Sequence, residues 1–290
     1  MAGGGLRIVR SDREDADGYR NELVPGLKAS ADAEHLAEEL AFAAARLAQL
    51  AADPTGVYAD IAAEPNREEA TWLAFLVAYL GPAEPAGARP GTAPTTPPGD
   101  PFAGIRAART AWGTGELPVL EGVPTGPRTA HDPSRGNRTL VAYCSWARRA
   151  GSQAGAFTGE SSWAPERRFE RVFERLALPG LHRAARFELL TLLGRLGVYE
   201  LRADGLHVGA GGDIELAAKR VFGIGERAVL ERRAADLAEA AELPLEALDL
   251  GLLNWARVDG RVTLGATASA DEPTRVRVRS SLGLGAAPRC

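Results

Sequence analysis

Residues 217–230 constrain the fold of this chain most, because two segments with helical apolar spacing are separated by Gly223-Ile224-Gly225. Glycine adopts positive φ readily, so a Gly-x-Gly turn allows a sharp reversal between two helices. The first N–H groups of the second helix have no partner within that helix and can point together at an anion. The sequence therefore predicts a helix, a two-glycine hairpin and a second helix that bind a nucleic-acid phosphate. The residues expected to contact DNA here are Gly223, Ile224, Gly225, Arg227, Lys219 and Arg220.

Length and composition predict an ordinary globular protein. The chain has 290 residues, enough for one large or two modest domains, with 45% hydrophobic and 25% charged residues. No apolar run approaches the roughly 18 residues that would span a bilayer. Residues 1–5 also lack a charged segment followed by an apolar one, as a secretion signal requires. We expect a soluble cytoplasmic protein with no membrane partner.

Cysteine and histidine usage argues against a metal site. The two cysteines, Cys144 and Cys290, are in no Cys-x-x-Cys spacing, which excludes a zinc ribbon or a four-cysteine iron–sulfur cluster. The four histidines are scattered without i, i+4 pairing. The sequence predicts neither a bound metal nor another cofactor.

The charges are unevenly distributed along the chain. A formal net charge of −4 argues against a protein that coats nucleic acid non-specifically. Basic residues nevertheless outnumber acidic ones over 131–230, which leaves room for a local positive surface. The only lysines are Lys28 and Lys219, and arginine forms no imine. Few residues could therefore form a Schiff base with a substrate.

Apolar periodicity predicts helices along most of the chain. In the N-terminal part these are 31–51 and 67–80, the second with Asn66 as its cap and an aromatic stripe typical of a core. Residues 81–101 are rich in proline and glycine and predict a linker. Residues 1–30 are expected to be flexible or irregular. The later helices are expected at 138–149, from Pro165 to about Leu176, and at 183–196, 214–221, 227–241 and 244–256.

One or two very short β-hairpins and a flexible end complete the predicted architecture. Asp204-Gly205 and Asp259-Gly260 each lie between short apolar runs, as in a tight hairpin turn. From residue 267 onward the pattern indicates a loose C-terminal tail. The predicted fold is mostly α, with a helical core over 102–266.

The turn at 223–225 resembles the Leu-Pro-Gly-Val-Gly hairpin of the helix-hairpin-helix DNA glycosylase superfamily. That resemblance implies a catalytic aspartate at the start of a following helix, and Asp249, which lies 24 residues after Gly225, occupies the matching position. A carboxylate near a helix N-terminus stays ionised and can stabilise positive charge on a sugar or position a nucleophile. The alternative is an ordinary surface or capping aspartate, and Glu246 could substitute for it.

The chain departs from that superfamily at two positions. Phe222 replaces the usual proline of the hairpin, and Arg227 stands where glycosylases that also cut the DNA backbone have a lysine. Because arginine forms no imine, a lyase step is not expected.

A second resemblance covers more of the chain. The segments 157–171, 217–225 and 248–255 resemble the α-glutamyl/putrescinyl thymine pyrophosphorylase family, particularly its clade 3. That family is described as having a glycosylase-like fold. The resemblance implies an enzyme that displaces pyrophosphate from a pyrophosphorylated 5-hydroxymethyluracil in DNA. The expected partners are double-stranded DNA with an everted base and a small amine, such as putrescine, or an amino acid.

This chemistry requires cations for the leaving group and a base for the amine. The candidate bases are Asp249, Glu160 and Glu166. Trp163 could stack on an everted base or serve as a packing anchor. The candidate cations, which could equally form solvated helix faces, are Arg148, Arg149, Arg167 and Arg168.

Three functions are consistent with these features. The first is a DNA base-modifying transferase of the pyrophosphorylase kind. The second is a monofunctional DNA glycosylase that uses Asp249 and forms no imine. The third is a non-catalytic DNA-binding protein that has the same fold.

Overall fold

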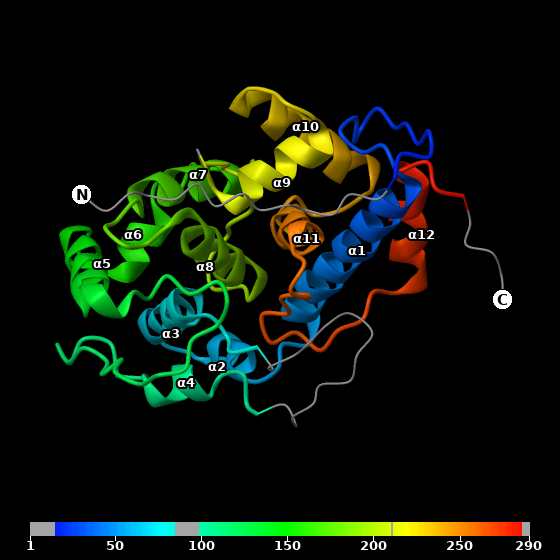
Figure 1. The fold of residues 1–290 in the computed structure, drawn as a ribbon. Coiled ribbons are helices and arrows are strands. Elements are labelled where there is room, and N and C mark those ends of the chain that lie inside the picture. Colours follow the sequence, from blue (N-terminus) through cyan, green and yellow to red (C-terminus); the bar gives the residue numbers. More distant parts are fainter. Residues whose placement is uncertain (1–14, 85–98, 210, 286–290) are drawn as a thin grey trace, which may run out of the picture.

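The computed structural model describes residues 15–84, 99–209 and 211–285, and over these ranges the chain forms twelve α-helices and no β-strand (Figure 1). The predicted mostly α fold class is therefore confirmed. The helices are α1 (Ser30–Ala52), α2 (Val57–Ala63), α3 (Arg67–Leu80), α4 (Ala103–Ala107), α5 (Arg138–Arg149), α6 (Gln153–Thr158), α7 (Pro165–Arg175), α8 (Arg183–Arg195), α9 (Asp213–Phe222), α10 (Arg227–Ala240), α11 (Glu246–Ala256) and α12 (Glu272–Ser281), with a 3₁₀ turn at Pro133–Arg135.

Local sequence signals set several helix ends. The side chain of Asn66 accepts a hydrogen bond from the N–H of Glu68 at 3.1 Å and caps α3, as predicted. Pro165 occupies the first turn of α7, where its missing N–H costs no hydrogen bond. Gly197 follows α8 with φ +72°, a backbone conformation that glycine adopts without strain.

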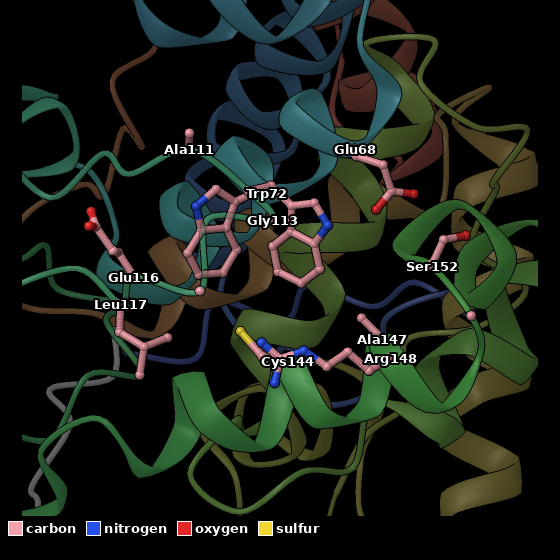
Figure 2. Close-up of a pocket in the computed structure, with 13 residues that line it drawn as sticks. Glu68, Trp72, Ala111, Gly113, Glu116, Leu117, Cys144, Ala147, Arg148 and Ser152 are labelled. Atoms are coloured by element: carbon pink, nitrogen blue, oxygen red, sulfur yellow. The ribbon is translucent and has the colours of Figure 1, made fainter.

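The aromatic stripe of α3 lies in the core, as its periodicity predicted. Trp72 stacks on Phe75 with ring centroids 5.4 Å apart, and Phe75 stacks on Tyr143 of α5 at 3.8 Å. Figure 2 shows Trp72 above the α5 helix that carries Cys144. This aromatic packing joins α3 to α5, while α3 also packs against α8. The N-terminal helices thus belong to the same hydrophobic core as the later ones.

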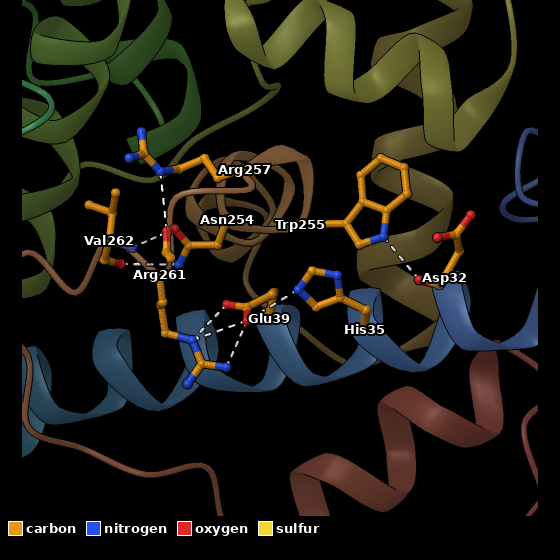
Figure 3. A network of polar contacts seen from close by, with 9 residues as sticks. Asp32, His35, Glu39, Asn254, Trp255, Arg257, Arg261 and Val262 are labelled. Carbon is orange, nitrogen blue, oxygen red and sulfur yellow. Dashed lines mark hydrogen bonds and ion pairs between the residues drawn. The ribbon is translucent and has the colours of Figure 1, made fainter. Parts of the chain in front are cut away.

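Polar contacts tie α1 to α11 and to the segment after it (Figure 3). The carboxylate of Glu39 accepts hydrogen bonds from Arg261 at 2.7 to 3.1 Å, and the indole N–H of Trp255 donates to the carbonyl of Asp32 at 2.9 Å. Asn254 exchanges two hydrogen bonds with the backbone of Val262. These bonds fix residues 261–262 against the two packed helices.

Neither predicted β-hairpin forms, and side chains explain why. The N–H groups of Leu206 and Val208 donate to the carboxylate of Glu231 at 2.6 and 2.8 Å, so they make no cross-strand bonds. In the second segment the N–H groups of Thr263 and Leu264 donate to Glu84. Carboxylates from distant elements thus satisfy backbone donors that a ladder would otherwise pair.

The C-terminal segment differs from the predicted loose tail. It contains α12, which the side chain of Asp271 caps by accepting from the N–H of Thr274 at 2.8 Å. Val278 and Leu282 are buried, and the hydroxyl of Tyr19 donates to the carbonyl of Leu282 at 2.6 Å. In Figure 1 this helix lies alongside α1. The sequence pattern shows little sign of it, because Val278 is the one buried apolar side chain within α12, and Leu282 and Leu284 follow the helix.

Part of the predicted domain scheme lies outside the described residues. These parts are 1–14, 85–98 within the predicted linker, and 286–290 in the predicted tail. Residues 15–29 are irregular, yet Val24 and Leu27 are buried. No helix in the described ranges meets the length and apolarity needed to cross a bilayer.

Candidate functional site

Helices α9 and α10 are joined by a tight turn at the surface, residues 223–226, which we call the elbow. Gly223 has φ +81° and begins it, and the side chain of Ile224 is 95% exposed at its tip. Glu226 precedes α10 but makes no side-chain cap, and the first-turn N–H groups of Arg227 and Ala228 lack partners within the helix. The elbow therefore presents backbone donors at an accessible position.

Only one of the two glycine positions in the elbow has a backbone conformation that favours glycine. The two glycines permit a turn with positive φ, and of these two only Gly223 has it. A Cβ on Gly225 would meet Val229 at 3.3 Å, which is tight but not prohibitive. The missing side chain of Gly225 thus leaves room for a ligand to approach the backbone closely, whereas the turn itself depends on Gly223.

The N-terminal segment packs directly behind the elbow. The N–H of Gly26 donates to the carbonyl of Val221 at 2.9 Å. A Cβ on Gly26 would collide with the carbonyl of Arg220 and lie 2.8 Å from the nitrogen of Gly223. On the other side, Arg233 donates to the carbonyl of Phe222. The elbow is therefore held from two sides.

The predicted cations around the elbow have partners within the protein. Lys219 forms an ion pair with Glu215 at 2.8 Å, and Arg227 with Glu231 at 3.8 Å. The guanidinium of Arg220 lies 4.6 Å from the ring centroid of Trp255. Exposed ion pairs such as that of Arg227 are weak, so its guanidinium can exchange its partner for a phosphate.

Asp249 lies in the first turn of α11, as predicted, but beneath the surface. Its side chain accepts a hydrogen bond from Arg128 at 2.7 Å on one oxygen and from Arg183 on the other, and the residue is 2% exposed. Burial alone raises the pKa of a carboxyl, but the two guanidinium groups outweigh it and lower the pKa of Asp249 below its ordinary 3.8. Asp249 is therefore an ionised carboxylate that holds two arginines in place.

These two arginines line a cavity of about 390 Å³, which we call the arginine cavity. Its wall includes the start of α8 and the start of α9, where neither His182 nor Gly212 provides a side-chain cap. Free N–H groups at two helix N-termini add to the positive potential of the arginines. Its charged and imidazole-bearing residues are Arg128, Arg183, Arg257, His182, Asp213 and Glu215.

One nitrogen in this cluster has no hydrogen-bond partner. The side chain of Arg128 is 8% exposed, and its buried Nη1 is unsatisfied. A buried donor without an acceptor costs about 1–3 kcal/mol. Other buried atoms of the described residues, among them Nε of Arg46 and Oγ1 of Thr191, are also unsatisfied, so this state alone does not mark a ligand site.

The other predicted acids lie away from the arginine cavity. Glu166 forms an ion pair with Arg202 at 3.1 Å, and Glu160 is an exposed residue between α6 and α7. Neither residue lines the cavity or contacts Asp249. The structure does not bring the three predicted acids together.

The predicted residues around α7 make structural contacts. Arg168 is buried and donates to the carbonyls of Thr158, Trp163 and Glu200. Trp163 packs against Gly159, and the guanidinium of Arg167 lies 6.0 Å from its ring centroid. Trp163 therefore matches the packing-anchor alternative in this structure.

The remaining predicted arginines are in the last turn of α5. Arg148 and Arg149 are both exposed, and Arg148 lines a different cavity, near Trp72. Neither residue reaches the arginine cavity.

Sequence reasoning missed Arg128, Arg183 and Arg257. Arg128 lies in a segment rich in proline and glycine without periodicity, and it is 121 residues from Asp249 in the chain. Arg183 is 66 residues from Asp249. The only available signal was Arg183 beside the start of a predicted helix, which does not specify a partner.

Comparisons with known proteins leave the family open: no family model, no curated protein and no solved structure matches this chain. Within the described ranges, no group of three His, Cys, Asp or Glu side chains is placed to hold a metal ion.

Proposed function

We propose that this protein is a DNA base-modifying enzyme that replaces a diphosphate on a 5-(hydroxymethyl)uracil-derived base with an amine. The elbow binds the DNA backbone, and the arginine cavity receives the diphosphate of an everted base. The observation that carries the proposal is the pair of arginines that Asp249 fixes at the wall of the cavity.

The charge of the cavity suits a leaving diphosphate. When the bond between the exocyclic methylene carbon and oxygen breaks, its electron pair leaves with the diphosphate. Arginine donors already in position stabilise that developing charge without reorganisation, and they bind phosphate oxygens bidentately. Asp249 acts here as a positioning residue, because both its oxygens are committed to Arg128 and Arg183.

The incoming amine forms the new bond. Its nitrogen attacks the same methylene carbon and then loses a proton to a carboxylate. We assign that role to Asp213, an exposed acid among the residues that line the cavity. This assignment replaces the predicted bases Glu160 and Glu166, which lie elsewhere.

The elbow and the arginine cavity are at opposite ends of one helix. Helix α9 has ten residues, so its ends are about 15 Å apart at 1.5 Å per residue. Its N-terminal end lines the cavity, and its C-terminal end leads into the elbow. A single rigid element therefore sets the spacing between a bound phosphate and the reacting group.

The glycosylase alternative is supported less well. A glycosylase of this kind needs a free carboxylate oxygen beside the sugar, whereas both oxygens of Asp249 accept from guanidinium groups. An arginine-lined cavity is also better suited to an anion than to a neutral base.

The test uses duplex DNA that contains pyrophosphorylated 5-hydroxymethyluracil, incubated with the protein and either putrescine or an amino acid. The proposal predicts that each modified base loses its diphosphate, which appears as free pyrophosphate, and carries the amine less one proton in its place. Mass spectrometry of the DNA measures this exchange, and Arg128→Gln should abolish it. Alkali-labile abasic sites would instead indicate a glycosylase. DNA binding without either product would indicate a non-catalytic DNA-binding protein.

A further inference from the structure

A second cavity, of about 360 Å³, lies between α3, α5 and the loop at 111–117, and we call it the tryptophan cavity. Figure 2 shows Trp72 at its centre, Cys144 below it and Arg148 reaching in from α5. Its volume is at the small end of the range for ligand sites, about 300–1,000 Å³. The fold leaves this space open although the surrounding core is closely packed.

Two indole rings form the aromatic part of its apolar surface. Trp72 is 2% exposed and immobile, because it stacks on Phe75 and its Nε1–H donates to the carbonyl of Thr110 at 3.0 Å. Trp112 is half-buried on the loop, with its ring centroid 5.3 Å from that of Trp72 and a 49° angle between the planes. The cavity thus combines a fixed aromatic ring with a second one that solvent can reach.

The two charged side chains at the edge of the tryptophan cavity differ in whether they already have partners. The carboxylate of Glu68 accepts from the N–H groups of Gln153 and Ala154 at 3.0 and 2.7 Å, so its charge is committed to the start of α6. Arg148 is exposed, makes no ion pair with a described residue, and extends beneath the indole rings in Figure 2. The group available to a ligand is therefore a donor-only cation.

The thiol in the cavity is not a nucleophile. Burial raises the pKa of the Cys144 thiol above its ordinary 9.0 and outweighs the opposing effect of Arg148. A protonated, buried thiol is inert at neutral pH. This site is suited to binding and not to covalent chemistry.

We propose that the tryptophan cavity binds a planar heteroaromatic ring that carries an exocyclic oxygen, as in a hypoxanthine, guanine or uracil base. The ring stacks on Trp112, and the oxygen accepts from the guanidinium of Arg148. Stacking needs only a flat π face, whereas the guanidinium requires an acceptor and disfavours a ring whose corresponding substituent is an amino group. This inference needs neither DNA nor the arginine cavity and stands independently of the proposed function.

The test compares inosine with adenosine, which differ where the oxygen of hypoxanthine replaces the amino group of adenine. Binding to the full-length protein is measured by calorimetry and by quenching of tryptophan fluorescence. We expect inosine to bind and adenosine to bind at least about ten-fold more weakly.

The variants separate the two contacts. Trp112→Ala is expected to weaken inosine binding by about ten-fold or more, the size of effect seen when a base–aromatic contact is removed. Arg148→Gln is expected to weaken it by a similar factor, because a hydrogen bond to a charged donor is lost. Trp112→Phe should retain most of the affinity, and Arg149→Gln, a neighbour outside the cavity, should retain all of it. Thermal melts of each variant verify folding.

Three results would overturn the inference. These are no binding of inosine to the wild-type protein, equal affinity for adenosine, and wild-type affinity in a folded Arg148→Gln variant.

Discussion

The two ends of helix α9 depend on different physical interactions. At its N-terminal end the arginine cavity relies on buried charges, with Asp249 paired to Arg128 and Arg183. At its C-terminal end the elbow relies on backbone geometry, with Gly223 in the left-handed region and Ile224 in solvent. Changes at the first end should cost stability and anion binding together. Changes at the tip of the second should cost DNA binding alone.

The largest expected effect is that of Asp249→Asn. Removing one partner of a buried ion pair leaves uncompensated charge and costs about 3–5 kcal/mol of unfolding free energy. Urea unfolding at neutral pH measures this loss. Asp236→Asn, an exposed acid on α10, serves as the control and should change stability by less than about 0.5 kcal/mol. Equal stability of both variants would show that the charges of the arginine cavity do not support the fold.

The pH dependence of the same difference is a second check. Because the pKa of Asp249 is lowered from 3.8 in the folded state, its contribution is fully present above that unfolded value. It is lost as the pH falls through the folded pKa. The stability gap between wild type and Asp249→Asn should therefore be constant near neutral pH and shrink below about pH 3.8. A gap that shrinks instead between pH 7 and 5 would contradict the lowered pKa.

A smaller effect is expected from Gly26→Ala, which acts on the elbow from behind. The added methyl collides with the carbonyl of Arg220, and overpacking of this kind costs about 1–3 kcal/mol. Because the elbow must shift, affinity for duplex DNA at fixed salt should fall as well. Gly99→Ala, where a Cβ meets nothing within 4 Å, should change neither quantity. If Gly26→Ala bound DNA with unaltered affinity, the packing of the N-terminal segment would not be needed for DNA binding by the elbow.

The two elbow glycines should respond differently to alanine. Gly223→Ala forces a Cβ into the left-handed region and should cost about 1–2 kcal/mol. Gly225→Ala meets only Val229 at 3.3 Å and has no positive φ, so it should cost less stability. Thermal denaturation of the two variants side by side measures the difference, and the reverse order would contradict the assigned conformations.

The smallest effect on stability belongs to Ile224→Ala. Since this side chain is 95% exposed, its loss should change unfolding free energy by less than about 0.5 kcal/mol. If the elbow contacts DNA, the same variant should weaken duplex binding measured by fluorescence anisotropy. If Ile224→Ala and Gly223→Ala each bound DNA with wild-type affinity, the elbow would not be part of the DNA interface.

Local sequence signals predicted much of the fold and little of the site. The Asn66 cap and the aromatic spacing of Trp72 and Phe75 act within one helix, so α3 was predicted with its observed bounds. The elbow was also located correctly, because glycine at 223 reports a local backbone requirement. Signals of this kind need no knowledge of tertiary structure.

The rest depended on contacts between distant residues. Asp249 was singled out because the resemblance to the glycosylase superfamily implies an aspartate at that position, but its environment depends on Arg128, 121 residues away. The predicted hairpins failed for the same reason, since Glu231 takes the backbone donors near Leu206. Arginines on helix faces, such as Arg168, cannot be sorted by sequence into those that bind ligand and those that bind carbonyls.

If Asp249 and its two arginines form an anion site, the protein should bind inorganic pyrophosphate, which calorimetric titration measures. We expect wild-type protein to bind pyrophosphate and Arg257→Gln to bind it about ten-fold more weakly, because this variant removes a cation from the same cavity without breaking the Asp249 pairs. Arg232→Gln, an exposed arginine outside the cavity, should bind like wild type. Equal pyrophosphate affinity in all three proteins, or none in the wild type, would contradict an anion site in this cavity.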